Sequence, residues 1–129
     1  MELATKKATE RMQGAWQLKA LNREGDSEPL KGITANMQIV VEGDRRTVQA
    51  GKAVYTQAYY AIDPYAQPPA IDVIVTGGSM RGQTLLGIYS IEGDRMRVCL
   101  ASAGRDRPRD FNPRAGSGQT LQELERVSP

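Results

Sequence analysis

The sequence contains no histidine among its 129 residues, and this absence limits the chemistry that it can perform. Without an imidazole there is no Ser-His-Asp or Cys-His nucleophilic site, and the commonest protein ligand of zinc is missing. Cys99 is the one cysteine, so an internal disulfide and a CxxC metal or redox motif are both excluded. We therefore expect no metal and no other cofactor.

The sequence also lacks an excess of charge and any long apolar run. Lys and Arg number 17 against 15 Asp and Glu, a net charge of +2, so the strongly basic surface of a nucleic-acid-binding protein is absent. No apolar stretch reaches the ~18 residues of a transmembrane helix. The N-terminus has no apolar core of the kind that a secretory signal needs. We expect no lipidation either, because Glu2 stands where myristoylation requires glycine and the C-terminus ends Val-Ser-Pro. We expect a cytoplasmic protein with neither a nucleic-acid nor a membrane partner.

The chain does contain many short segments in which β-branched and apolar residues alternate with polar ones, separated by Gly, Asp or Pro. A short helix is expected before them, over about Ala4–Met12, with Gly14 just past its end. The length suits one domain, residues 1–129. The expected strands are Ala15–Leu21, Ile33–Val41, Arg45–Ala50, Ala53–Ile62, Ala70–Thr76, Gln83–Ile91, Arg95–Ala101 and Thr120–Arg126.

The connections between these segments predict their arrangement. No 10–15-residue helical crossover separates them, which favours an antiparallel meander over parallel βαβ units. Val41-Glu42-Gly43-Asp44-Arg45 and Ile91-Glu92-Gly93-Asp94-Arg95 repeat one pattern, explained by two hairpins with the same turn chemistry or by a duplicated binding element. About eight strands close naturally into a small barrel, whose interior is either packed or holds one small ligand. The predicted fold is an all-β, up-and-down barrel with a short N-terminal helix.

Three residues give this barrel a structural signature. Gly14-Ala15-Trp16 resembles the Gly-x-Trp that opens the first strand in lipocalins and other calycins. The usual partner of that Trp is an Arg near the end of the last strand, and Arg126 lies where it is expected. An Arg over an indole ring gains ~0.5–2 kcal/mol of cation–π energy and ties the first strand to the last.

A resemblance to one family extends over nearly the whole chain. The segments that carry it include Tyr60-Ala61-Ile62-Asp63-Pro64, Leu86-Gly87-Ile88-Tyr89, Arg107-Pro108-Arg109-Asp110-Phe111 and Gly116-Ser117-Gly118-Gln119-Thr120-Leu121. In their order and spacing the chain is similar to a lipocalin-like domain family of unknown function, best known from planctomycete-type bacteria. The resemblance implies a lipocalin-like barrel with a possible pocket, and no particular reaction.

Several side chains are candidates for a site in such a barrel. Asp72 lies on a strand that is apolar on both faces, where it is either a structural carboxylate paired with an Arg or a ligand anchor inside the lumen. Tyrosines combine an apolar ring with a hydroxyl group, so they either line a cavity or pack in the core. Cys99 is inert unless a neighbouring Arg lowers its pKa. The candidate ligand-binding residues are Tyr55, Tyr59, Asp72, Tyr89, Arg97 and Cys99.

The segment from Gly104 to Arg114 concentrates four Arg and two Asp. It is either a clamp for a phosphate or carboxylate, or a salt-bridged loop across the barrel mouth with Phe111 covering apolar surface. The Gly-rich segments near Gly77 and Gly116 match neither a P-loop nor a dinucleotide fingerprint, and they are expected to be turns.

Three functions follow from these patterns. The first is binding of a small apolar or amphipathic molecule in the lumen, with oligomerisation possible. The second is a cofactor-independent enzyme of cyclase or isomerase type that folds its substrate in the barrel, with Asp72 or Glu123 as acid/base and tyrosines and Arg97 orienting. The third is a packed barrel that acts as a protein-interaction module. The volume of the lumen distinguishes the first from the third, since ligand sites have ~300 Å³ or more.

Overall fold

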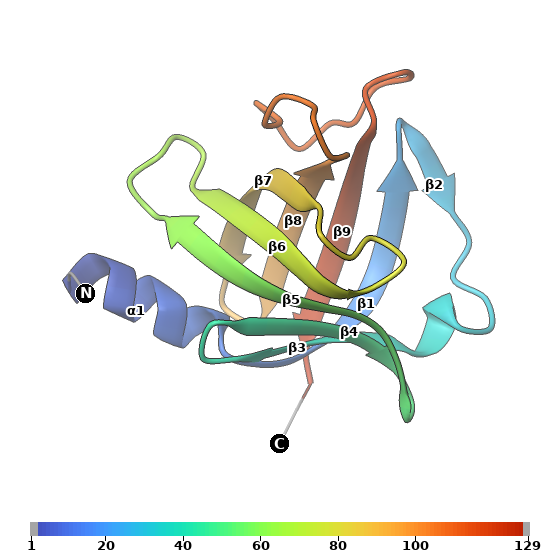
Figure 1. Ribbon diagram of the computed structural model, residues 1–129, viewed down its shortest axis with the longest axis horizontal. Helices are drawn as coiled ribbons and strands as arrows, with labels where there is room; N and C mark the ends of the chain where they lie inside the picture. The colour runs from blue at the N-terminus through green and yellow to red at the C-terminus, as the bar shows by residue number, and fades with distance from the viewer. Residues whose placement is uncertain (1–2, 128–129) are drawn as a thin grey trace.

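A single closed sheet dominates the structure, a computed structural model that describes residues 3–127. Glu2 and the terminal Ser128 and Pro129, used above to argue against lipidation, lie outside this range. The helix α1 (Leu3–Met12) precedes all the strands, as Figure 1 shows. The strands are β1 (Gly14–Arg23), β2 (Asp26–Glu28), β3 (Met37–Glu42), β4 (Arg45–Ala50), β5 (Ala53–Asp63), β6 (Ala70–Gly78), β7 (Thr84–Glu92), β8 (Arg95–Ala101) and β9 (Gln119–Arg126).

The sheet closes because β1 pairs with both β3 and β9. Residues 14–17 of β1 pair with β3, while residues 16–23 pair with β9 around a bulge between Leu18 and Ala20. Each later strand pairs antiparallel with the next, and β2 only extends the free upper side of β1. The result is an eight-stranded, up-and-down antiparallel barrel with one short helix before it. The predicted fold class is confirmed.

The sequence prediction fails in the segment before β3. Ile33 has helical backbone angles and Thr34–Asn36 form a 3₁₀ turn (η1), so the strand begins at Met37 rather than at Ile33. The Thr34 hydroxyl donates to the Lys31 carbonyl at 2.9 Å and accepts from the Lys31 N–H at 3.0 Å. Such local bonds stabilise a turn against an extended strand. The three-residue β2 was also not predicted.

The barrel has one filled end and one open end. The hairpins β3–β4 and β7–β8 lie at the filled end, where α1 joins β1, and Met12 and Trp16 are almost wholly buried there. The β4–β5, β6–β7 and β8–β9 connections lie at the opposite end together with η1. Inward side chains form one core cluster from Trp16, Ile39, Val41, Tyr60, Val73, Met96 and Leu124, among others. Room for a ligand therefore has to be sought at the open end.

The predicted contact between the first and last strands is confirmed. The Arg126 guanidinium carbon lies 4.2 Å from the centre of the Trp16 ring, and these two residues are register partners. Arg126 also donates to the carbonyls of Gln13 and Arg11 at 2.6 and 2.8 Å. Gly14 has φ +115°, and a Cβ there would lie 3.2 Å from Arg126 Nη1, so glycine is required beside the Arg.

Residues 3–127 contain no helix that is both long enough and apolar enough to cross a membrane.

Candidate functional site

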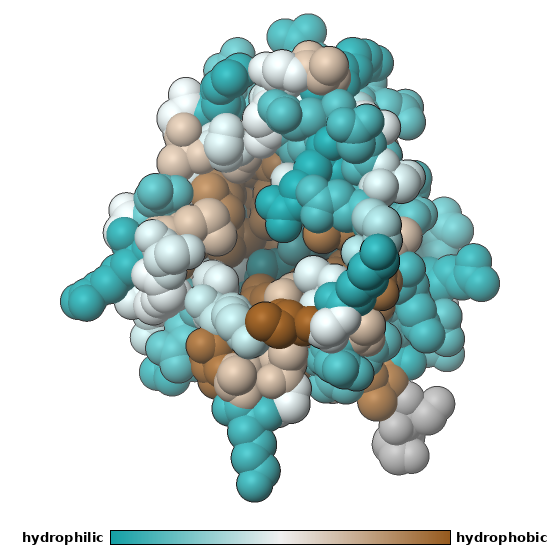
Figure 2. All heavy atoms as spheres, turned by 90° about the vertical axis from the view of Figure 1, so that its right-hand side faces the viewer, coloured by the Kyte–Doolittle hydropathy of each residue, from teal (hydrophilic) through white to brown (hydrophobic). Residues whose placement is uncertain are grey.

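The open end of the barrel holds a cavity of about 430 Å³. Figure 2 views the molecule from the side of the β6–β7 connection and η1, and it shows a recess with hydrophobic residues along its inner wall. The volume lies within the ~300–1,000 Å³ range of small-molecule sites. Its apolar lining comes from Leu18, Leu21, Met37, Met80, Leu85 and Leu100, and its polar lining includes Thr34, Thr120 and Gln122. We call this space the mouth cavity.

Below the mouth cavity, the interior contains one buried charge among the described residues. Arg46 on β4 is 4% exposed, and its register partners are Val41 and Ala58, both inward-facing core residues. Burial lowers the pKa of Arg46 to about 10, which leaves the guanidinium protonated at neutral pH. No Asp or Glu within residues 3–127 forms an ion pair with it.

Arg46 reaches across the barrel from β4 to β9. Its Nη2 donates a hydrogen bond of 2.8 Å to Oε1 of Gln122, a residue 76 positions later in the chain. Gln122 also lines the mouth cavity, so the guanidinium lies one side chain away from that space. An unpaired charge in a protein interior costs several kcal/mol even after relaxation. The Arg46–Gln122 contact thus leaves a buried cation with one neutral acceptor and no carboxylate partner among the described residues.

Arg46 was not among the site residues expected from the sequence, although it directly follows the repeated turn motif. Arg46 follows Glu42-Gly43-Asp44-Arg45 in the same way that Met96 follows Glu92-Gly93-Asp94-Arg95. Both positions point inward at the filled end of the barrel, and Met96 is a core residue. The repeat thus reflects two equivalent hairpins, one with an apolar side chain at this position and one with a cation.

The tyrosines divide between the two sides of the barrel wall. Tyr89 is buried in the core cluster, where desolvation raises its pKa. Tyr55 and Tyr59 are 39% and 41% exposed on β5, and Arg45 packs on the Tyr59 ring at 5.6 Å. Tyr60, which was not among the predicted ligand-binding residues, faces inward and donates to the Gly43 carbonyl at 2.6 Å. Neither Tyr55 nor Tyr59 lines the lumen.

Asp72 lies on the outer wall and has a structural partner. Its Oδ1 is 2.7 Å from Arg107 Nη2, without the alignment of a hydrogen bond, and Arg107 Nη1 donates to the carbonyls of Ile71 and Gly87 at 3.1 and 2.8 Å. The Arg-rich segment is therefore a loop held against the outside of β6 and β7. This loop begins at the rim of the mouth cavity and continues on the outer wall, so it does not cross the opening. Beside it, a cleft of about 620 Å³ is lined by Asp72, Arg107 and the β5–β6 connection.

Cys99 is also on the outer wall, completely buried where the same loop passes. Desolvation, with a smaller contribution from the Asp110 charge, raises the pKa of Cys99 to about 11. The nucleophilic alternative required a neighbouring Arg to lower the pKa of Cys99, and the pKa is raised instead. The thiol is protonated at neutral pH and enclosed, which favours the inert alternative.

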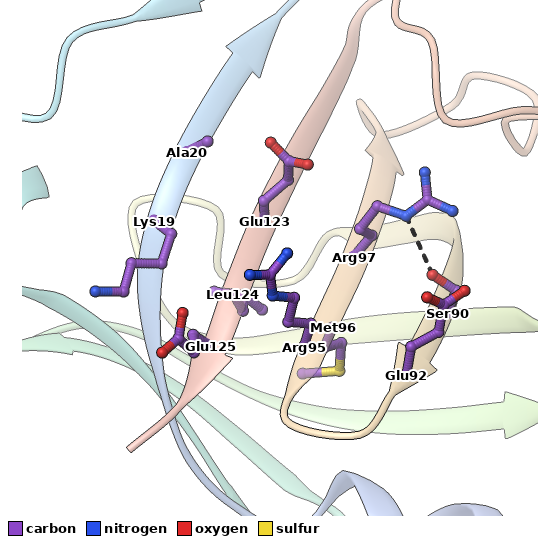
Figure 3. Close-up of a pocket in the computed structure, with 10 residues that line it drawn as sticks. All are labelled: Lys19, Ala20, Ser90, Glu92, Arg95, Met96, Arg97, Glu123, Leu124 and Glu125. Atoms are coloured by element: carbon purple, nitrogen blue, oxygen red, sulfur yellow. Dashed lines mark hydrogen bonds between the residues drawn. The ribbon is translucent and has the colours of Figure 1, made fainter. Parts of the chain in front are cut away.

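Glu123 and Arg97 line a charged groove of about 470 Å³ on the outer faces of β1, β9, β8 and β7. Figure 3 shows acidic and basic side chains interspersed along it, with Arg97 donating to the Ser90 hydroxyl at 3.2 Å. Phe111 of the loop packs on Arg97, with the guanidinium carbon 4.1 Å from the ring centre. Such mixed charge is typical of a solvated face.

The structure does not bring the proposed acid/base groups together with the tyrosines. Asp72 is bound to the loop, Glu123 lies in the outer groove, Tyr59 is on the outer face of β5 and Tyr89 is inside. Within residues 3–127, no three Cys, Asp or Glu side chains gather in a way that could hold a metal ion. Searches against protein-family models, curated proteins and solved structures find no match to this chain.

Proposed function

We propose that this protein binds a small apolar or amphipathic molecule in the mouth cavity of its barrel. The observation that carries the proposal is the cavity itself, about 430 Å³ with six large apolar side chains in its lining. An apolar molecule that enters it is removed from water at ~25 cal/mol per Å² of buried apolar surface. We further propose that the chain is a member of the lipocalin-like family that it resembles, a proposal supported by the packing of Gly14, Trp16 and Arg126.

The filled lower barrel supports the same proposal. Trp16, Met12 and Met96 are each at most 2% exposed, so they form a packed floor under the mouth. Rigid scaffolds commonly carry binding sites at their open ends, where the loops meet. Catalysis is the weaker alternative, because its acid/base candidates lie in separate places on the outer wall.

Filling the mouth cavity tests the proposal. Met37 lines the cavity, and the substitution Met37→Trp places a bulky ring in it. Wild-type protein is expected to enhance the fluorescence of the neutral probe N-phenyl-1-naphthylamine, and Met37→Trp is expected to abolish most of that enhancement. Met80→Trp, from the opposite rim, is expected to act in the same way.

Val54→Trp provides the matched control, since Val54 is 50% exposed on the outer wall. This variant is expected to bind the probe as wild type does. If both cavity variants fold, as judged by circular dichroism, and still bind the probe with wild-type affinity, the mouth cavity is not the binding site.

A further inference from the structure

Arg46 has no carboxylate partner among residues 3–127. Buried cations in proteins are normally paired with a carboxylate, and this one has a single neutral acceptor, Gln122 Oε1 at 2.8 Å. Its counterpart in the second hairpin, Met96, shows that an apolar side chain suits the same place in the barrel. Replacement of a buried charge by an apolar residue of similar volume is often neutral or stabilising. An Arg at this position therefore calls for a ligand-based explanation.

The geometry leads from Arg46 to the mouth cavity. The guanidinium carries five N–H donors in a planar fork, and Gln122 takes one of them. Gln122 lies in the cavity wall, and its side chain can turn its amide group, so its acceptor can be exchanged for one delivered from the cavity. A carboxylate is the best replacement, because its two oxygens match the fork and its charge neutralises the cation.

We propose that Arg46 anchors the carboxylate of a fatty-acid-like amphiphile, whose apolar chain extends through the mouth cavity toward solvent. The inference rests on the proposed function and specifies its ligand class. One guanidinium and one neutral amide match a single negative charge, whereas a dianionic phosphate would leave a buried charge uncompensated. The apolar part of the mouth lining, with Leu21 as the register partner of Gln122 and with the partly buried Met37 and Met80, suits an alkyl chain.

Isothermal titration with dodecanoate and dodecan-1-ol, at a pH where the acid is ionised, tests this assignment. The two molecules share one alkyl chain and differ in the headgroup, so their affinity ratio reports the anchor. Hydrogen bonds to a charged group contribute ~1.5–3 kcal/mol, which predicts that wild-type protein binds the acid about ten- to a hundredfold more tightly than the alcohol. Arg46→Met is expected to remove this preference and leave the affinity for the alcohol unchanged.

Arg45→Met is the matched control, since Arg45 is the preceding residue on the same strand and is exposed on the opposite face. It is expected to keep the wild-type preference for the acid. Equal binding of acid and alcohol by the wild type would overturn the assignment of Arg46, and so would an Arg46→Met variant that keeps the preference. In both cases the alcohol still binds and the proposed function stands. If neither molecule binds the wild type, the proposed function fails together with the inference. Should Arg46→Met not fold, the wild-type ratio still decides, because equal binding of acid and alcohol overturns the assignment.

Discussion

At the scale of single residues, Arg126 and Arg46 differ in how many partners their buried or half-buried charges have. Arg126 packs on Trp16, donates to two carbonyls and pairs with Asp94 at 3.3 Å. Its charge therefore has several partners, and these contacts help to hold the barrel closed. Arg46 is more deeply buried and has one neutral partner. The first residue contributes to stability, whereas the second is expected to cost stability.

This difference predicts the effect of Arg46→Met on folding. Because the substitution removes an unpaired buried charge, the free energy of unfolding is expected to stay within about 1 kcal/mol of wild type or to rise. Urea denaturation followed by Trp16 fluorescence measures it. A loss of ~3–5 kcal/mol, the usual effect of breaking a paired buried charge, would show that Arg46 is a structural residue.

Gly14 provides a second test at this scale. Gly14→Ala introduces a Cβ at φ +115° and 3.2 Å from Arg126 Nη1, so it is expected to destabilise the protein by about 1–3 kcal/mol. Gly82→Ala is the control, because Gly82 also has a strongly positive φ, +88°, and nothing within 4 Å of the added Cβ. Equal losses in the two variants would contradict the requirement for close approach by Arg126, since backbone strain alone would then explain both.

At the scale of elements, the loop between β8 and β9 is held by Arg107. Its guanidinium reaches two backbone carbonyls and Asp72 on the outer wall, and Cys99 is buried where the loop passes. Reaction of Cys99 with a thiol reagent therefore requires the loop to open, and its raised pKa of about 11 means that the enclosed thiol is protonated at neutral pH. The thiol is thus a natural reporter of loop opening.

Arg107→Gln is expected to accelerate labelling of Cys99 by 5,5′-dithiobis(2-nitrobenzoic acid) in native buffer at least severalfold. Arg114→Gln should leave the rate unchanged, because the Arg114–Asp110 pair is exposed and such pairs contribute little to stability. Equal labelling rates for wild type and Arg107→Gln would show that Arg107 does not hold the loop in place.

The elements themselves were largely predictable from the sequence. Arg45–Ala50 and Arg95–Ala101 are strands with the predicted bounds, because a Gly-Asp turn precedes each and period-2 alternation runs through each. Ile33–Asn36 was predicted wrongly, because a β-branched residue near Thr34 reads as strand while the hydrogen bonds of Thr34 to Lys31 favour a turn.

At the scale of the whole molecule, the sequence was a poor guide to which strand faces point inward. Tyr55, Tyr59, Asp72, Arg97 and Cys99 all lie on the outer wall, and of the six predicted ligand-binding residues Tyr89 alone belongs to the interior core. Alternation defines two faces and does not say which one closes around the lumen. Moreover, the loop after β8 buries outer residues such as Cys99, so an apolar strand like β8 is covered on both sides. Arg46 was not predicted as an interior residue, because a charged residue on a strand is assigned to the exposed face unless the register of that strand shows otherwise.

The central claim is that a ligand occupies the open end of the barrel above a filled floor, and the methionines test it most directly. Met37 and Met80 line the mouth cavity, while Met12 and Met96 are almost wholly buried at the filled end. We would record spectra of protein labelled with ¹³C at the methionine methyl groups during titration with dodecanoate. We expect saturable shifts of the Met37 and Met80 resonances, with that of Met12 nearly unchanged. Shifts confined to Met12, or no shifts at saturating dodecanoate, would contradict the claim.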